Sequence, residues 1–370
     1  MKALLLATVM LAVSCSGASS TGPAAAGSSS SSSSSSLVSC VVGPQTPPLR
    51  TIAATFPTAL AFAPDGRLFF AQRSGAVRVW QAGAVRLFAK VNASQSGERG
   101  LLGLAISPTF AIDRFVYAFY SDADGTHQEV VRWTDCGGTG TNITTLVRLP
   151  AGSDCCHKGG RLAFGPDGKL YVTLGEEHVA RVASNTTDVR GKVLRYNPDG
   201  SVPADNPFGQ SNPVWAAGFR NPFGIAFSSS GAMAVTNNGP TGDAGSPSTG
   251  YDTVIESVQR GGIYQWPTCY GYGHVIASGG SCSGIAPDWS SESNTVVPTG
   301  AAFVDDAGPS GYAGHLVFCT LGVGMLVLTP AGGRLHASVE SGPPDCRLDV
   351  KQGPDHALYY ADTGHIYRLG

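Results

Sequence analysis

Residues suited to proton transfer stand at the two ends of a predicted hairpin. The stretch "HKGGRLAFGPDGKLYVTLGE" begins with His157 and ends with Glu176. Its alternating apolar residues and central Pro-Asp-Gly turn are typical of two antiparallel strands, which would bring the glutamate back towards the histidine. An imidazole, whose pKa lies near neutrality, can take a hydroxyl proton, and a carboxylate can orient the ring. A histidine in a polar, Gly-rich loop can also be merely solvated, but the pair together predicts a general base.

The same strand–turn–strand pattern recurs along the chain. Turn signals stand near residues 65, 108, 167, 230 and 355, and the last interval is about twice the one before it. A diverged unit, for which the segment from Gly314 onward is the candidate, fills that gap. Six antiparallel units of roughly 45–65 residues predict an all-β fold, a six-bladed β-propeller of four-stranded antiparallel blades. A sandwich or a barrel explains the alternation but not the period.

The predicted architecture also predicts where ligands bind. Loops and inner strands of all blades converge on the central channel of a propeller, so a residue just before an inner strand, such as His157, is a site candidate. A closed ring must join its first and last blades. We therefore expect a strand from residues 40–56 to complete the blade that ends with "HIYRLG".

Composition supports an exported β protein. The 370 residues include 49 Gly and 24 Pro, and only 14% are charged. Such a composition suits a turn-rich β fold better than a helical one. The net charge is −2 and no run of Lys or Arg is present, so we expect no nucleic-acid partner.

The N-terminal residues are typical of an export signal. "MKALLLATVMLAVSCSG" has one lysine, a short apolar run and a small residue before Cys15, and it resembles a bacterial lipoprotein signal. We expect a signal peptide over residues 1–14, a Ser-rich tether over 15–39 and a single propeller domain over 40–370. The expected location is periplasmic or extracellular, with a lipid anchor at Cys15 holding the protein to a bacterial membrane.

The remaining cysteines form an even set, since Cys15 is one of nine. An even number in an exported chain favours disulfides, and no pair has zinc-site spacing. Cys269–Cys282 is the pairing we predict first, because it closes a short Gly-rich loop. Cys155 and Cys156 can form a vicinal disulfide, but we expect each to bond a separate partner.

Five motifs in order carry a resemblance to a known family. They are "SGERGLLGLAISPTF", "HKGGRLAFGPDGKLYVTLGE", "GFRNPFGIAF", "NNGPTGD" and "YDTVIESVQRGGIYQWP". The chain resembles the soluble pyrroloquinoline-quinone (PQQ) sugar dehydrogenases, the glucose/sorbosone dehydrogenase family with the aldose sugar dehydrogenases. The likeness is good over about residues 57–270 and looser over 300–370.

The resemblance implies roles for the polar residues of these motifs. His157 would be the general base on the sugar C1 hydroxyl, oriented by Glu176, while hydride passes to PQQ. Arg220 would contact the PQQ carbonyls, where a guanidinium stabilises developing negative charge, and Asn221 would also reach the cofactor. An arginine at a strand start can instead be a surface residue. The product would be a lactone, and electrons would leave to an external acceptor (a quinone, a cytochrome or a dye).

The resemblance also implies a calcium site. In "NNGPTGD", the backbone carbonyls of Gly239 and Pro240 would bind a Ca²⁺ that PQQ also ligates, beside the cofactor contact Asn238. The same letters are equally typical of a tight turn. Asp252 is the nearest match to a carboxylate that holds a second, structural Ca²⁺.

The chain departs from the family pattern at three predicted cofactor contacts. Glu98 stands where a neutral side chain is common, and Arg99 or Ca²⁺ would have to offset its repulsion from the cofactor carboxylates. Gly322 stands near the position of an anchoring Lys. Arg347 is the one arginine kept from a closely spaced pair. Fewer cations predict weaker or differently oriented binding of the three PQQ carboxylates.

Two other function classes compete with the enzyme. A propeller that has lost its cofactor anchors can be a non-catalytic binding module for a glycan or a protein, as Hedgehog-interacting relatives of the family suggest. A Ca²⁺-dependent lactonase is the third class, but that chemistry needs a carboxylate-rich channel, whereas the predicted calcium ligands here are mainly backbone carbonyls.

Overall fold

Six four-stranded antiparallel sheets form a β-propeller, as predicted. The computed structural model describes residues 40–152, 154–276, 280–331, 334–338 and 342–370. The predicted signal peptide, the Ser-rich tether and Cys15 lie outside the described residues. The sheets all belong to one compact unit, residues 39–370.

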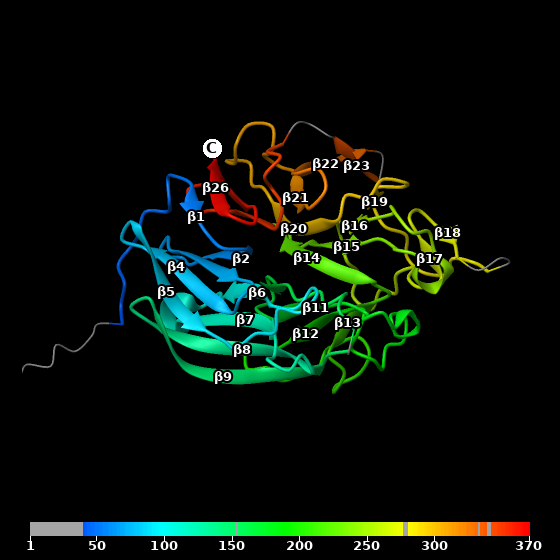
Figure 1. Ribbon diagram of the computed structural model, residues 1–370, viewed down its shortest axis with the longest axis horizontal. Coiled ribbons are helices and arrows are strands. Elements are labelled where there is room, and N and C mark those ends of the chain that lie inside the picture. The colour runs from blue at the N-terminus through cyan, green and yellow to red at the C-terminus, as the bar shows by residue number, and fades with distance from the viewer. Residues whose placement is uncertain (1–39, 153, 277–279, 332–333, 339–341) are drawn as a thin grey trace, which may run out of the picture. The chain divides into compact units, whose positions relative to one another are not determined.

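Five blades are built from strands that follow one another in the chain, and Figure 1 shows them around a common centre. The first two contain β2 (Pro57–Phe62), β3 (Leu68–Gln72), β4 (Ala76–Gln81) and β5 (Ala84–Lys90), then β6 (Leu101–Ile106), β7 (Phe115–Ser121), β8 (His127–Cys136) and β9 (Thr139–Pro150). The next two contain β10 (Leu162–Phe164), β11 (Leu170–Leu174), β12 (Lys192–Tyr196) and β13 (Val214–Ala217), then β14 (Asn221–Phe227), β15 (Met233–Asn238), β16 (Thr253–Ile255) and β19 (Trp289–Ser290). The fifth contains β20 (Pro298–Phe303), β21 (Leu316–Thr320), β22 (Leu326–Ala331) and β23 (Arg334–Ser338).

The sixth blade closes the ring with strands from both ends of the described chain. It contains β24 (Asp349–Gln352), β25 (Leu358–Ala361), β26 (His365–Leu369) and β1 (Ile52–Ala53). Ile52 pairs with Ile366 in the outermost ladder, so the predicted closing strand from residues 40–56 is confirmed. The diverged unit predicted from Gly314 onward supplies β21, β22 and β23.

The other elements are short. A two-stranded ribbon joins β17 (Cys269–Tyr270) and β18 (His274–Val275), and the helical turns are α1 (Phe110–Asp113), η1 (Ala180–Val182) and η2 (Asp243–Gly245). Among the described residues, no helix is long and apolar enough to cross a membrane.

The hydrophobic core is divided among the blade interfaces. The innermost strands β2, β6, β10, β14, β20 and β24 neighbour one another in a closed ring. One apolar cluster fills each of the six interfaces. Side chains alternate across a strand, so Phe69 packs towards the second blade and its neighbour Phe70 towards the sixth.

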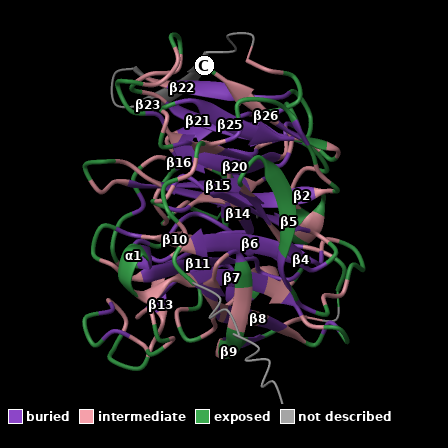
Figure 2. Cartoon of the chain, turned by 90° about the vertical axis from the view of Figure 1, so that its left-hand side faces the viewer, coloured by how far each residue is buried: buried purple, intermediate pink, exposed green. Residues whose placement is uncertain are grey.

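Burial decreases towards the outer strands. Figure 2 shows the inner strands buried, while β5 at the outer edge of the first blade is mostly exposed. Because the inner strands are buried along their length, they can contact a ligand only near their ends, where the channel opens. Functional side chains are therefore expected in the loops that lead into these strands.

Four disulfides join the eight described cysteines: Cys40–Cys136, Cys155–Cys156, Cys269–Cys282 and Cys319–Cys346. The predicted Cys269–Cys282 pairing is confirmed. The expectation that Cys155 and Cys156 bond separate partners is wrong, because every other described cysteine already has a partner in its own region of the fold. The vicinal pair directly precedes His157.

Candidate active site

His157 and Glu176 meet at the channel end of the third blade. β10 and β11 are antiparallel, so the loop before β10 lies beside the residues that follow β11. Nδ1 of His157 is hydrogen-bonded to the Glu176 carboxylate, and the two residues are 4% and 0% exposed. A Cβ on Gly175 would come within 2.0 Å of the His157 carbonyl oxygen, so glycine is required for this approach. The bond at Nδ1 leaves Nε2 as the nitrogen that can act as a base.

The environment of His157 favours the neutral ring. Burial lowers the pKa of His157 below its ordinary value of 6.5, and the positive charge of Arg220 lowers it further, although the bond to Glu176 opposes this. A neutral imidazole is the form that accepts a proton. The second carboxylate oxygen of Glu176 is buried without a hydrogen-bond partner among the described residues.

Arg220 is held just before β14 by polar groups of one loop. Its guanidinium donates to the Gly239 carbonyl at 2.6 Å and to the Thr241 hydroxyl at 2.7 Å, and both oxygens of Asp243 accept from it. Burial alone would raise the pKa of Asp243, but the guanidinium outweighs burial and holds the pKa at about 2. Asp243 in turn lies near His157, since one of its carboxylate oxygens is within 4.8 Å of a ring nitrogen of His157. The cation is therefore next to the base.

Three predicted cofactor contacts form one network across the blades. Glu98 accepts hydrogen bonds from the backbone N–H of His157 at 2.7 Å and from the Asn221 amide at 3.3 Å. Asn221 also donates to Asn238 at 3.0 Å, and Asn238 donates to the Pro298 carbonyl at 2.7 Å. The structure therefore brings Glu98, Asn221 and Asn238 together.

Glu98 is not compensated by its sequence neighbour. The Arg99 guanidinium donates to the Gly152 carbonyl at 2.9 Å, away from the Glu98 carboxylate. The backbone N–H of Glu98 donates to the Cys155 carbonyl at 2.8 Å, which ties this loop to the vicinal disulfide. Neutral donors therefore contact the Glu98 carboxylate. Arg99 does not offset the negative charge of Glu98, as the resemblance required of it.

A cavity of about 200 Å³ opens at the channel mouth beside this network. Residues at the ends of all six innermost strands line it, together with Glu98, Asn221 and Asn238. Two arginines also line it. Arg161 is 4% exposed and donates to the carbonyls of Phe223 and Leu348, so it ties blades together. Arg73 is half-buried at the cavity wall and donates to the carbonyls of Gln95 and Arg99.

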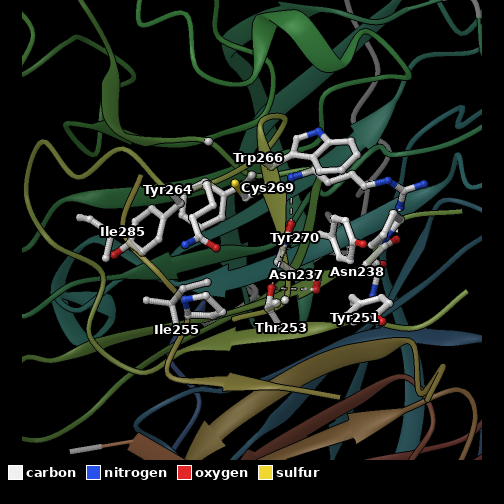
Figure 3. Close-up of a pocket in the computed structure, with 18 residues that line it drawn as sticks. Asn237, Asn238, Tyr251, Thr253, Ile255, Tyr264, Trp266, Cys269, Tyr270 and Ile285 are labelled. Atoms are coloured by element: carbon white, nitrogen blue, oxygen red, sulfur yellow. Dashed lines mark hydrogen bonds between the residues drawn. The ribbon is translucent and has the colours of Figure 1, made fainter. Parts of the chain in front are cut away.

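The predicted calcium ligands lie at a second, smaller pocket. Gly239 and Pro240 line a cavity of about 40 Å³ beside Arg220. Figure 3 shows the rings of Tyr251, Trp266 and Tyr270 around this pocket. The pocket is too small for a cofactor, but it borders the carbonyl of Gly239 that Arg220 contacts.

Asp252 holds the loop that contains Gly239 in place through backbone contacts. Its carboxylate accepts from the N–H of Gly239 at 2.8 Å and from those of Val296 and Val297 at 2.8 and 3.0 Å. The side chain is 3% exposed. These bonds join the fourth blade to the start of the fifth, and the predicted metal role of Asp252 stays a prediction.

Arg347 is near the cavity without lining it. Its guanidinium donates to the carbonyl of Leu321 at 2.5 Å, and the Leu321 and Leu348 side chains line the cavity wall. Gly322, at the position predicted to lack a lysine, follows Leu321. This side of the mouth therefore presents apolar groups where the resemblance implies cations.

Residues not predicted from sequence complete the site. His178 lies against His157, with the rings perpendicular and their centroids 3.9 Å apart, and Asp154 pairs with His178. Lys158 and Glu177 form a fully buried ion pair behind the His157–Glu176 pair. The runs "DCCHK" and "EEH" at the two ends of the hairpin contain these residues, and their ionisable side chains were the available signal.

Comparison with known proteins identifies the family. The six blades and the polar site at the channel mouth define the class, and a family model described as Glucose / Sorbosone dehydrogenase matches residues 54–368. The chain belongs to this family, as the motifs predicted. It is 33% identical over 226 residues to an Escherichia coli aldose sugar dehydrogenase, covering 57% of this chain and 58% of that protein.

Two further comparisons agree with this assignment. The chain is 30% identical over 254 residues to quinoprotein glucose dehydrogenase B of Acinetobacter calcoaceticus, covering 58% of this chain and 51% of that protein. The crystal structure of the soluble E. coli aldose sugar dehydrogenase, in the apo-form, has a TM-score of 0.72 at 27% identity, covering 86% of this chain and 99% of that one. The sequence matches thus span a little over half of the curated relatives.

Proposed function

We propose that the protein is a PQQ- and Ca²⁺-dependent dehydrogenase that oxidises an aldose or a related sugar at C1. The observation that carries the proposal is the group of a buried histidine, its orienting carboxylate and a buried cation at one channel mouth. His157, Glu176 and Arg220 form this group. A relative that is 30% identical is named a quinoprotein, which supports a quinone cofactor.

The residues of this chain have distinct tasks in the proposed reaction. Nε2 of His157 takes the proton of the C1 hydroxyl, and Glu176 holds the ring with Nε2 facing the substrate. PQQ, when bound, supplies a quinone that accepts two electrons. An aldose that loses the C1 hydride and this proton becomes a lactone. The electrons then leave to an external acceptor, a quinone, a cytochrome or a dye.

The polar groups at the mouth fit this cofactor. Arg220 would offer a cation to a quinone oxygen, and the Asn238 side-chain amide, which donates only to Pro298 among the described residues, could donate to another of its polar atoms. Asn221, which donates to Glu98 and Asn238, would have to exchange one of these bonds to reach the cofactor.

Arg73 and Arg161, which line the cavity, and Arg347 beside it are further cations for the cofactor carboxylates. The buried, unpartnered oxygen of Glu176 can accept a donor that arrives with a ligand.

The calcium proposal depends on backbone oxygens. A hard cation prefers oxygen ligands, and Gly239 and Pro240 line the pocket beside Arg220. The Arg220 guanidinium, which donates to the Gly239 carbonyl, would have to release it for Ca²⁺ to bind there. Asp252 fixes the Gly239 backbone through its N–H, so it would support the site even without binding metal. Export to the periplasm or the outside, with a lipid anchor at Cys15, belongs to the same proposal.

The competing function is a binding module without a cofactor. The apolar wall formed by Leu321 and Leu348 favours it, because the cofactor carboxylates need cations. Titration of the purified protein with PQQ, with Ca²⁺ and after chelation, separates the two functions. We expect Ca²⁺-dependent binding, followed by dye reduction with at least one sugar of an aldose panel. An absence of PQQ binding at saturating Ca²⁺ would replace the enzyme with the binding module.

A further inference from the structure

We propose that His178 and Asp154 form a proton outlet, which carries to water the proton that His157 takes from the substrate. The inference rests on the proposed function and goes beyond it, because it assigns a task to two positioning residues outside the reacting groups. The outlet consists of His157, His178 and Asp154, with Glu176 at its inner end.

The four side chains form a continuous hydrogen-bonded chain. Glu176 contacts Nδ1 of His157, Nε2 of His157 lies 3.0 Å from Nε2 of His178, and Nδ1 of His178 lies 2.7 Å from an oxygen of Asp154. The exposed fraction of the side chain rises along it, from 0% for Glu176 and 5% for His157 to 32% for His178 and 45% for Asp154. The chain therefore runs from the buried base to solvent.

The number of ring hydrogens on the two histidines follows from the three hydrogen bonds that their ring nitrogens make. Each outer imidazole nitrogen faces a carboxylate and must carry hydrogen, and the two facing Nε2 atoms must share one more hydrogen between them. Two neutral rings hold only two hydrogens, so one of the three contacts would be unmade. The two histidines of the outlet therefore hold one excess proton jointly, between two carboxylates.

The neighbours of the two histidines decide where this proton resides and where it can go. The ring of His157 contacts Glu176 and lies near Asp243 and the cation of Arg220. The ring of His178 contacts Asp154 at the surface. Burial and the charge of Arg220 disfavour a positive charge on the His157 ring. Other exits are blocked among the described residues: Asp243 is paired with Arg220, and Lys158 is buried against Glu177.

Substrate and His178 compete for the same nitrogen. Nδ1 of His157 is occupied by Glu176, so a C1 hydroxyl can reach only Nε2, which His178 occupies here. The backbone N–H of His178 donates to Glu176 at 3.1 Å, which fixes the loop while the partly exposed ring can rotate. Substrate thus displaces the His178 ring, and the ring returns when product leaves.

One proton enters from the substrate and one leaves to water in each turnover. The displaced His178 ring loses its Nε2 hydrogen to solvent and keeps the Nδ1 hydrogen that Asp154 accepts. The C1 hydroxyl proton moves to Nε2 of His157 and then to Nε2 of the returning His178, which restores the excess proton that the two rings share. No oxidant or reductant is consumed by this transfer.

The first test uses the protein without cofactor. In wild type, exchange with water of the hydrogen at Nε2 of His157, followed by nitrogen-15 NMR, is expected to be fast. His178→Gln keeps a hydrogen-bonding group within reach of Nε2 but cannot carry a proton. We expect exchange to slow by about 10²-fold, the lower end of what a positioned acid–base group contributes. His356→Ala is the matched control, because His356 forms a 2.9 Å pair with Asp305 far along the chain and should change nothing.

The second test follows proton release from the PQQ-loaded protein with a pH-indicator dye in stopped flow. His178→Gln should oxidise sugar in a first turnover but release the proton about 10²-fold more slowly than wild type. His178→Ala opens space at the ring, so added imidazole should restore release. Wild-type exchange and wild-type proton release in His178→Gln would overturn the outlet. If loaded wild type oxidises no sugar, the proposed function fails, and the cofactor-free exchange still decides the outlet.

Discussion

The two sides of the channel mouth carry different kinds of groups. On the third and fourth blades, His157, Glu176 and Arg220 are buried and joined by hydrogen bonds, ion pairs and close charge contacts. On the fifth and sixth blades, Leu321 and Leu348 line the cavity of about 200 Å³, to which the fourth blade contributes Asn221. Groups that suit the proposed reaction therefore lie on one side. On the other side, the described residues that line the cavity are mainly apolar, and Arg347 lies beside them without lining it. Turnover and PQQ affinity can therefore be tested separately, by substitutions on the two sides.

Replacing the base tests the reactive side and has the largest expected effect. His157→Ala removes the proton acceptor while leaving Arg220 and Asn221 in place. Turnover should fall by about 10²–10⁴-fold, the usual contribution of a positioned acid–base group, and PQQ affinity should stay near wild type. Steady-state dye reduction and PQQ titration measure the two quantities. A parallel loss of affinity would show that His157 holds the cofactor instead.

Replacing the cation should affect both quantities. Arg220→Ala should lower turnover by about 10²-fold, since the guanidinium stabilises charge in the transition state. It should also lower PQQ affinity by about tenfold, the value of one hydrogen bond to a charged group. Arg368→Ala, which removes a surface guanidinium paired with Asp355 at 3.0 Å, is the control. Unchanged affinity in Arg220→Ala would contradict a cofactor contact.

Adding a cation to the apolar side tests whether the cofactor carboxylates face this wall. Leu321 lines the cavity and is 47% exposed, so a lysine there can reach a cofactor carboxylate. Leu321→Lys should raise PQQ affinity by about tenfold at low salt and less at high salt, because the added attraction is screened. Leu321→Met keeps the wall apolar and should match wild type. Equal affinity in Leu321→Lys and Leu321→Met would mean that the carboxylates do not face this wall.

The pH dependence gives the smallest expected change. The base works only as neutral imidazole, so activity falls as the pH falls through the pKa of His157. Burial lowers this pKa, so the acidic limb of kcat/KM should lie below pH 6.5. The bond to Glu176 raises the pKa, so Glu176→Gln should move the limb to still lower pH. A limb above pH 6.5 in wild type would exclude this assignment.

Much of this arrangement follows from strand pairing and could be predicted. Period and turn spacing predicted the blades, and the antiparallel hairpin of β10 and β11 predicted the meeting of His157 and Glu176. Likewise Asn221 pairs with Asn238 in the ladder of β14 and β15, which brings Arg220 to the following Gly239. Which residues face each other in a hairpin depends mainly on the turn and on the alternation of apolar residues, and both can be recognised in the sequence.

The unpredicted contacts depend on loop conformations that no periodicity encodes. His157 and His178 both have positive φ values, 57° and 58°, which turn their side chains towards each other. Non-glycine residues rarely adopt this region, so it cannot be assumed from residue type. The pairing of Asp243 with Arg220 and the vicinal disulfide at Cys155 likewise arise from loop geometry.

A single-turnover measurement tests the central claim most directly. Protein loaded with one PQQ in the presence of Ca²⁺ is mixed with excess aldose without oxygen or dye, and the quinone absorbance and the lactone are followed together. The account predicts loss of the quinone spectrum and one lactone per bound PQQ in wild type, with the rate greatly reduced in His157→Ala. A bound quinone that no aldose of the panel reduces would contradict the account and leave a propeller that binds without catalysis.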